Sequence, residues 1–283
     1  MERSLNTKTT VNGATGRRHG TMEKVASKDG TQIAYDKQGT GPAVMLIDGA
    51  LCYRSFGPMP GLAQLLAPHF TVYTYDRRGR GESGDTKPYA VEREVEDLEA
   101  LIDNAGGSAN LCGLSSGAAL ALEAAIKLGD TVQKLAMYEA PYAADAAAQQ
   151  AAKEYNKKLT ELLAADRRGD AAALFMELVG TSADQIEGMR HAPVWTMFEA
   201  VAPTLAYDSA VLGTGHAAPF ERAGTARAPA LIMNGGASFP FMYDTAQALC
   251  NVMPNAQLRT LEGQRHDVNP EALAPVLVEF FTA

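Results

Sequence analysis

Ser115 lies in the residue pattern that most directly indicates chemistry. The segment 109–120 reads ANLCGLSSGAAL, in which an apolar run leads into Gly-x-Ser-x-Gly and then into small residues. A serine held in a sharp turn between a strand and a helix presents its hydroxyl as a nucleophile, and glycines two positions away on either side let the backbones pass closely. Gly113 and Gly117 occupy those positions. We therefore expect Ser115 to be a nucleophile; the alternative is an ordinary turn between strand and helix.

A nucleophilic serine needs a base to accept its proton, and an imidazole commonly serves. His266, in the segment LEGQRHDV, follows the last expected strand and precedes the last expected helix. The other histidines lie in the N-terminal segment, before a strand, or in a helical stretch in the middle of the chain (His19, His69, His191 and His216). We expect His266 to be the base; the alternative is an ordinary histidine in a surface loop.

Short, almost wholly apolar runs predict buried strands over residues 43–47, 70–75, 109–112, 135–138 and 230–233, and a last strand is expected over 257–261. Such runs are typical of parallel strands that are covered on both faces. Stretches between them predict helices over 91–104, 118–128, 243–252 and 271–281, and residues 23–35 predict a hairpin. This alternation predicts an α/β fold with a doubly wound, mostly parallel sheet. Ser115 and His266 both follow strands, so we expect them at the same edge of that sheet.

Residues 142–225 interrupt the alternation, because they contain helical stretches and no convincing strand. A long helical interval between two strands of the sheet is best interpreted as a cap over the carboxyl edge, where α/β folds bind ligands. We therefore expect a core formed by residues 22–141 and 226–283, with a helical cap over 142–225. Residues 1–21 are polar with almost nothing to bury, and they are expected to form a flexible tail.

From Glu23 to the C-terminus, the chain resembles the α/β-hydrolase superfamily, in the branch with a serine nucleophile and a helical cap. The resemblance rests on Gly-x-Ser-x-Gly, on the late histidine and on residues 75–84 (YDRRGRGESG), which are similar to the D-x-R-G-x-G-x-S loop of that superfamily. It implies an α/β-hydrolase fold. Ser83 in this loop lacks the paired glycines, so we do not expect it to be the nucleophile. A serine rather than an aspartate at position 115 also disfavours dehalogenase and epoxide hydrolase chemistry.

Asp48-Gly49-Ala50 departs from the pattern of the superfamily, in which a His-Gly pair is usual after the third strand. The resemblance implies an oxyanion hole made from the backbone N–H groups of Ala50 and Ser116, which the side chain at position 48 does not change. A carboxylate beside an oxyanion would oppose its formation. We therefore expect Asp48 to turn away from the site as a buried structural acceptor, with a catalytic role as the less favoured alternative.

The acid that supports the histidine is also displaced. In most relatives it follows the strand after the cap, but here that loop carries Ser238, and a neutral hydroxyl cannot stabilise an imidazolium as a carboxylate does. Glu139 stands at the end of the preceding strand, as in one branch of the haloalkane dehalogenases, and keeps the chain order serine, acid, histidine. We expect Glu139 to be the acid. Asp244 is the next candidate, and a dyad without an acid is a further alternative.

Apolar side chains in the cap and in the loop that follows it could line a substrate pocket. Trp195 and Phe198 lie in the cap, and Phe239 and Phe241 lie in the loop where the usual acid would stand. Aromatic side chains at helical spacing more often belong to a core, so packing is the alternative. If they line the site, they favour a small, largely apolar substrate.

Together these residues predict a serine hydrolase that cleaves an ester-like bond, a carboxylester or a lactone, through an acyl-enzyme on Ser115. This chemistry requires no metal and no organic cofactor. A C–C bond hydrolase or a perhydrolase would use the same serine. The alternative of a different class is a non-catalytic ligand-binding protein that has kept the fold.

The composition and charge of the chain exclude several classes of protein. A chain of 283 residues with 46% hydrophobic and 20% charged residues fits a soluble globular protein with a large core. The net charge of −8 disfavours nucleic acid, whose binding needs an excess of cations. No apolar run approaches the ~20 residues that span a bilayer, and three distant cysteines indicate neither disulfides nor zinc, so we expect a cytoplasmic protein. The expected partner is a small-molecule substrate, and assembly into a homo-oligomer stays open.

Overall fold

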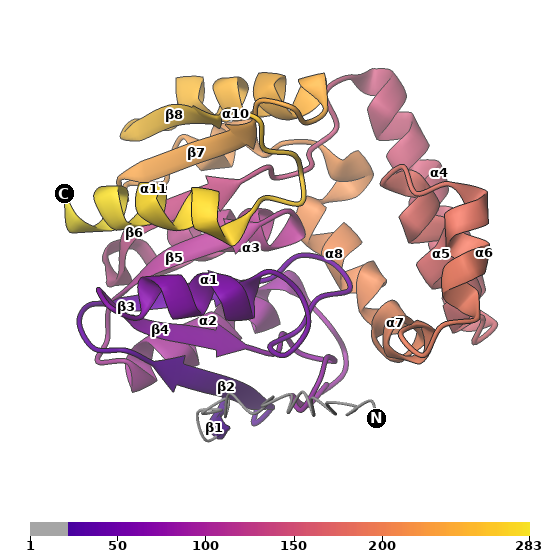
Figure 1. Ribbon diagram of the computed structural model, residues 1–283, viewed down its shortest axis with the longest axis horizontal. Helices are drawn as coiled ribbons and strands as arrows, with labels where there is room; N and C mark the ends of the chain where they lie inside the picture. The colour runs from indigo at the N-terminus through magenta and orange to yellow at the C-terminus, as the bar shows by residue number, and fades with distance from the viewer. Residues whose placement is uncertain (1–21) are drawn as a thin grey trace, which may run out of the picture.

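Within residues 22–283, the part of the chain that the computed structural model describes, eight strands form one sheet in the order β1-β2-β4-β3-β5-β6-β7-β8 (Figure 1). The expected tail, residues 1–21, lies outside the described residues. β2 is antiparallel to both β1 and β4, and the other neighbours are parallel. The prediction of a mostly parallel sheet is therefore confirmed. The strands are β1 (Glu23–Ala26), β2 (Gln32–Gln38), β3 (Ala43–Ile47), β4 (Thr71–Tyr75), β5 (Ala109–Leu114), β6 (Val132–Tyr138), β7 (Ala230–Gly235) and β8 (Ala256–Leu261).

Helices cover both faces of the sheet, which explains why its central strands are apolar along their whole length. β3 reads AVMLI and β5 reads ANLCGL, and almost all of their side chains are buried. One face packs against α1 (Met59–Leu66) and α11 (Pro270–Thr282). The other face packs against α2 (Val91–Asn104), α3 (Ser116–Leu128) and α10 (Pro240–Val252). Alternating layers of helix, sheet and helix thus leave only the edges and ends of the sheet open.

A helical insertion separates β6 from β7. It contains α4 (Ala146–Ala164), α5 (Arg168–Leu178), α6 (Ala183–Arg190), α7 (Trp195–Val201), α8 (Leu205–Leu212) and α9 (Phe220–Ala223). Helices α4 to α7 stand beyond the carboxyl ends of the parallel strands and have a hydrophobic core of their own (Figure 1). In contrast, α8 and α9 lie back against α3. The interval in which the sequence predicts a cap therefore contains an outer part, α4–α7, and an inner part that packs on the core helices.

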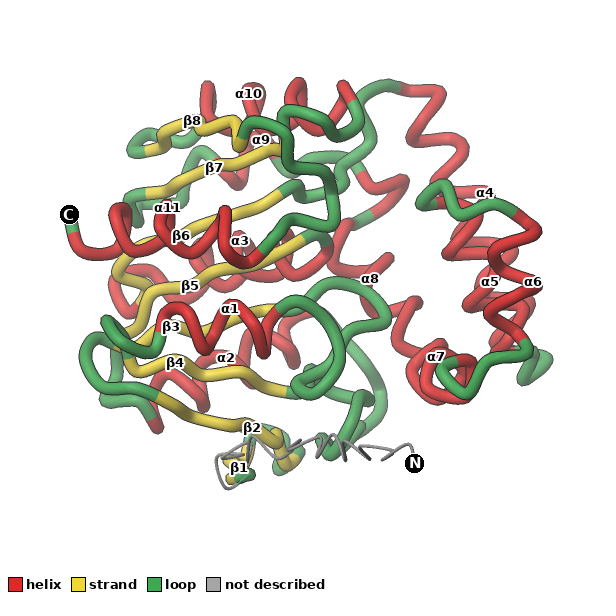
Figure 2. Tube along the Cα trace, viewed as in Figure 1, coloured by secondary structure: helices red, strands yellow, loops and turns green. Residues whose placement is uncertain are grey.

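The loops that follow β3, β5, β6, β7 and β8 gather at the end of the sheet that faces the insertion (Figure 2). Parallel strands run in one direction, so residues that follow them along the chain become neighbours in space. This edge carries the residues that the sequence analysis singles out for chemistry.

Candidate active site

Ser115 occupies the turn between β5 and α3. Its backbone has φ 57° and ψ −128°, a conformation that residues other than glycine rarely adopt. A Cβ on Gly117 would lie 2.2 Å from the carbonyl oxygen of Ile47, and a Cβ on Gly113 would lie 2.2 Å from that of Gly117. Both glycines are therefore required by the close approach of backbone segments. The turn holds the Ser115 hydroxyl at the carboxyl edge of the sheet.

His266 lies in the loop between β8 and α11, and its Nε2 is 3.1 Å from Ser115 Oγ. The hydroxyl of Tyr138, the last residue of β6, donates a hydrogen bond to the carbonyl of Arg265 and so holds the backbone next to the imidazole. The side chain of His266 is 30% exposed, which leaves it open to a proton acceptor or a substrate from solvent. The structure thus brings the expected nucleophile and base within hydrogen-bonding distance.

Glu139 directly follows β6, and its Oε2 is 2.7 Å from His266 Nδ1. The residue is 2% exposed and has a positive φ of 48°. The backbone N–H of Gly235 donates to Oε1 at 2.7 Å, and the hydroxyl of Ser238 donates to Oε2 at 2.9 Å. Hydrogen bonds to both oxygens hold the carboxylate in one orientation. Ser238, which stands at the position of the usual acid, therefore contacts the displaced carboxylate.

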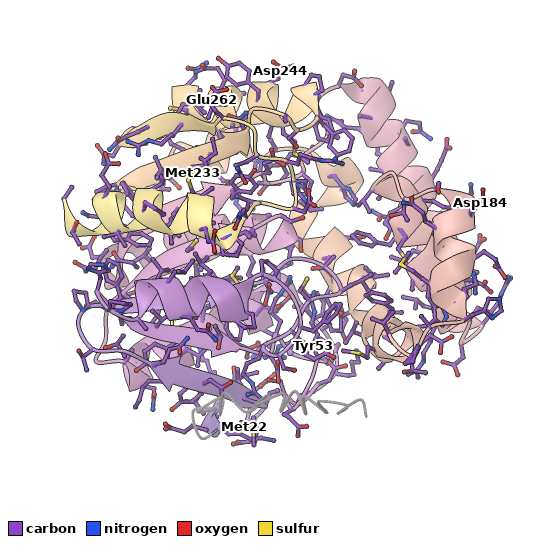
Figure 3. All side chains as sticks on the ribbon, viewed as in Figure 1. Met22, Tyr53, Asp184, Met233, Asp244 and Glu262 are labelled. Atoms are coloured by element: carbon purple, nitrogen blue, oxygen red, sulfur yellow. The ribbon has the colours of Figure 1, made fainter. Side chains whose placement is uncertain are left out.

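The competing candidates lie elsewhere. Asp244 is exposed on α10, and Figure 3 shows it at the outer surface of the molecule. The hydroxyl of Ser83 donates to the carbonyl of Asp76 and accepts from the N–H of Ala34, so it joins the loop after β4 to β2. Glu139 is the carboxylate that contacts the imidazole within residues 22–283.

Gly49, in the loop after β3, passes directly beside the serine. A Cβ on Gly49 would lie 3.0 Å from Ser115 Cβ and 3.6 Å from its Oγ. Ala50 follows Gly49, and Ser116 is the first residue of α3. An N–H group in the first turn of a helix has no carbonyl partner within that helix, so the N–H of Ser116 is available to another acceptor. The two residues expected to supply the oxyanion donors thus follow Ser115 itself and the glycine that lies beside it.

Asp48 is buried as expected, but the expectation of a structural acceptor is wrong for its Oδ1, which has no hydrogen-bond partner among the described residues. The nearby donors are engaged elsewhere: Arg77 and Arg80 donate to the backbone carbonyls of Asp48 and Gly49 and to Asp208. Burial raises the pKa of Asp48 to about 8, although the charges of Arg80 and Arg77 lower it. Burial therefore favours the neutral carboxyl, which opposes a nearby oxyanion less than a carboxylate would.

The loop after β4 carries three arginines that are at most 1% exposed, and all of them are ion-paired. Their carboxylate partners are Glu94 and Asp208 for Arg77, Asp97 and Asp29 for Arg78, and Asp208 for Arg80. Sequence reasoning assigns no role to Asp208. Its one signal is that it is the single charged residue of the α8 segment LAYDSAVL.

The aromatic residues that could line a pocket lie in different environments. Trp195 is 5% exposed within the core of the insertion, and its Nε1 donates to Glu199, so the structure gives it a packing role. The ring of Phe198 meets that of Phe56 edge-on at 5.7 Å, between the insertion and the loop after β3. Phe239 and Phe241 are 47% and 36% exposed and stack on each other. They lie at the start of α10.

Two features of residues 22–283 concern membranes and metal ions. No helix in this range is long and apolar enough to cross a membrane. Over the same residues, side chains of His, Cys, Asp and Glu form no group that could hold a metal ion. Cys52, Cys112 and Cys250 are free thiols.

The fold and the arrangement of serine, histidine and carboxylate at its carboxyl edge are those of an α/β hydrolase. A model of the Alpha/beta hydrolase family matches residues 39–277, and the chain belongs to this family. The resemblance seen in the sequence is therefore confirmed at the level of the family and the fold.

Solved structures of known proteins are similar over almost the whole chain. An α/β hydrolase from Sphaerobacter thermophilus is 50% identical, with a TM-score of 0.82 over 92% of this chain and 100% of that chain. An enol-lactonase from Burkholderia xenovorans shares the fold at 24% identity, with a TM-score of 0.70 over 92% of this chain and 100% of that chain. A thermophilic esterase from Thermogutta terrifontis does so at 21% identity, with a TM-score of 0.70 over 93% and 98%.

One curated relative matches a shorter stretch. The hydrolase YraK of Bacillus subtilis is 31% identical over 114 residues. The match covers 39% of this chain and 41% of YraK, so the chain spans about two fifths of that relative. The family is thus shown by the matched model, while the bond that this chain cleaves is a matter of proposal.

Proposed function

We propose that the chain is a serine hydrolase that cleaves a carboxylester or a lactone of a small, largely apolar substrate, with Ser115 as nucleophile, His266 as base and Glu139 as acid. The observation that carries the proposal is the continuous series of contacts from Ser115 Oγ to His266 Nε2 and from His266 Nδ1 to Glu139 Oε2, at 3.1 Å and 2.7 Å. Because Glu139 accepts a hydrogen bond from the N–H at Nδ1, Nε2 is left without a proton and can take the proton of Ser115.

In the first half of the reaction, Ser115 Oγ forms a bond to the carbonyl carbon while its proton moves to His266 Nε2. Glu139 then stabilises the imidazolium. The N–H groups of Ala50 and Ser116 donate hydrogen bonds to the carbonyl oxygen and stabilise the negative charge that develops on it. Collapse of this intermediate breaks the bond to the leaving alcohol, which takes the proton from Nε2. Water, deprotonated by the same imidazole, then releases the acid from Ser115.

Apolar side chains near the oxyanion loop support an apolar substrate. Leu51 follows Ala50 and is buried in the hydrophobic cluster of the insertion, with Phe198 packed against that cluster. Such a junction between a cap and a sheet can enclose an acyl or alcohol group. The enol-lactonase and esterase that share the fold accord with this bond class.

Hydrolysis of a short p-nitrophenyl ester tests the proposal. Ser115→Ala should lower kcat by several orders of magnitude, because no other group can form the acyl-enzyme. Ser108→Ala, which removes an exposed serine just before β5, is the matched control and should keep wild-type activity. If Ser115→Ala keeps more than about a tenth of the wild-type rate, Ser115 is not the nucleophile. A wild-type protein that binds esters and never turns them over would instead favour the non-catalytic alternative.

A further inference from the structure

Asp208 is a buried carboxylate on α8 of the insertion, and it contacts Ser116, the residue that follows the nucleophile. It is 4% exposed and lies in an otherwise uncharged helix. Its Oδ1 accepts hydrogen bonds from Ser116 Oγ at 2.7 Å, Arg77 Nη1 at 2.7 Å and Arg80 Nη2 at 2.8 Å. Its Oδ2 accepts a second bond from Arg80 Nη2 at 2.8 Å. One carboxylate thus joins the residue after the nucleophile to two arginines of the loop after β4.

The same two arginines reach the loop that contains Ala50. Arg80 Nη1 donates to the carbonyl oxygen of Gly49 at 2.5 Å and to that of Cys52 at 3.0 Å. Arg77 Nη1 is 3.3 Å from the carbonyl oxygen of Asp48. Three carbonyl groups of this loop are therefore held by guanidinium groups whose shared anion is Asp208.

The bond to the carbonyl of Gly49 bears directly on the oxyanion hole. The C=O of Gly49 and the N–H of Ala50 belong to one planar trans peptide unit, in which they point in opposite directions. A guanidinium that fixes the carbonyl on one side therefore fixes the N–H on the other. Withdrawal of electrons from the carbonyl also makes the N–H a better donor.

The charges balance only when Asp208 is present. Arg77 is shared between Glu94 and Asp208, whereas the ion-pair partner of Arg80 is Asp208. Burial raises the pKa of Asp208, but the charges of Arg80 and Arg77 and the hydrogen bond from Ser116 outweigh it, so the pKa lies below its ordinary value. Loss of this anion would leave Arg80 buried without a counter-charge and free to leave Gly49.

We propose that Asp208 is a positioning residue for the oxyanion hole: it holds Arg80 on the carbonyl of Gly49 and Ser116 at the start of α3, and so orients the N–H groups of Ala50 and Ser116. This inference rests on the proposed function. It assigns to the insertion a part in transition-state stabilisation, separate from any contact that α4–α7 make with substrate.

The test compares Asp208→Asn with wild type in ester hydrolysis and in binding of a trifluoromethyl ketone, which forms a charged hemiketal on Ser115. We expect kcat to fall about 10- to 100-fold, somewhat less than the ~10²–10³-fold that removal of a donor outright costs, with KM little changed. Affinity for the ketone should fall in parallel with kcat. If Asp208 served only folding, the folded variant would keep both the kcat and the ketone affinity of wild type.

Two further variants keep the test decisive if Asp208→Asn does not fold. Ser116→Ala removes the hydrogen bond to Asp208 and the longer one from Arg77 but leaves the ion pairs, and it should lower kcat and ketone affinity together by several-fold. Arg80→Lys keeps the charge but loses the guanidinium that bonds Gly49 and Asp208 together, and it should do the same. The matched control is Asp85→Asn, because Asp85 accepts the hydroxyl of Tyr207 on the same helix and does not touch the loop of Ala50. It should keep wild-type kcat.

Folded variants at positions 208, 116 and 80 with kcat and ketone affinity within two-fold of wild type would overturn the inference while leaving Ser115, His266 and Glu139 in place. If wild-type protein neither hydrolyses esters nor binds the ketone covalently, the proposed function itself fails, and the inference fails with it.

Discussion

Two residues of the site, the serine and the carboxylate, have strained backbone conformations. Ser115 and Glu139 both adopt positive φ, at 57° and 48°, and each such residue costs of order 1–3 kcal/mol. Their surroundings determine both conformations: the N–H of Ser115 donates to the carbonyl of Tyr138, and the N–H of Glu139 donates to that of Met233. Two neighbouring strands thus fix the nucleophile and the acid relative to each other.

Replacement of Glu139 by glutamine tests the displaced acid. An amide facing His266 Nδ1 favours the wrong tautomer and cannot stabilise imidazolium, so kcat should fall at least ~10²-fold with little change in KM. Asp244→Asn is the matched control, because that carboxylate is exposed on α10 and should be replaceable without effect. Steady-state kinetics on both variants check the ordering. If Asp244→Asn lost most of its kcat while Glu139→Gln kept wild-type activity, the acid would come from the segment after β7.

Asp48 predicts a dependence of stability on pH. Its pKa rises from 3.8 to about 8 on folding, so between these values the folded state holds a proton that the unfolded state has lost, and stability falls as pH rises. Asp48→Asn has no carboxyl at this position, so its stability does not fall with pH for this reason. The free energy of unfolding of the variant, relative to that of wild type, should therefore increase by up to about 1.4 kcal/mol per pH unit between these two pKa values.

Urea titrations at pH 5, 6 and 7 measure the gap between Asp48→Asn and wild type. Asp244→Asn serves as the control whose gap should stay constant. A constant gap for Asp48→Asn as well would mean that Asp48 is ionised in the folded protein.

At the scale of elements, the turn between β5 and α3 depends on the absence of side chains. Gly117→Ala would drive a Cβ to within 2.2 Å of the carbonyl of Ile47, so β3 and α3 must separate. We expect a loss of roughly 1–3 kcal/mol or more in the free energy of unfolding, and loss of activity, because the loop after β3 would shift. Gly188→Ala is the control.

Gly188 lies inside α6, and a Cβ there would meet no heavy atom within 4 Å. Its replacement by alanine should stabilise the protein by about 0.5–1 kcal/mol, since glycine is a poor helix former. Denaturant unfolding compares the two variants directly. Equal stability of both would show that the turn can relax without opening the sheet.

Some elements could be predicted from the sequence, and others could not. The strand 43–47 and the helix 91–104 agree with the structure to the residue, because an unbroken apolar run and a clear amphipathic period each specify one conformation. α1 was missed, since MPGLAQLL has proline and glycine as its second and third residues. α8 falls within the interval 142–225 that was expected to be helical, but the role of its Asp208 was missed because the partners of Asp208 lie 92 to 131 positions away in the chain, a pairing that no local pattern reveals.

At the scale of the whole molecule, α8 connects the helical insertion to the core. Leu205 of this helix packs in the cluster of the insertion, and Val211 and Leu212 pack in the cluster beside α3. The buried ion pairs of Asp208 cross the same boundary. We therefore expect the insertion and the core to unfold in one cooperative transition.

Trp195 gives a local probe for this expectation, because it is the single tryptophan of the chain and lies within the core of the insertion. Its fluorescence and the far-UV circular dichroism of the whole protein should follow one urea curve. Two separated curves, with fluorescence changing first, would show that the insertion unfolds independently of the sheet.

Labelling by a fluorophosphonate, followed by intact mass and peptide mapping, tests the central claim most directly. The reagent reacts with a serine that a histidine activates and whose oxyanion is stabilised, so it needs no knowledge of the natural substrate. We predict one adduct per chain, on Ser115, and none on Ser115→Ala under the same conditions. A wild-type protein that stays unmodified, or a Ser115→Ala variant that is labelled as fully as wild type, would contradict the assignment of Ser115 as the nucleophile.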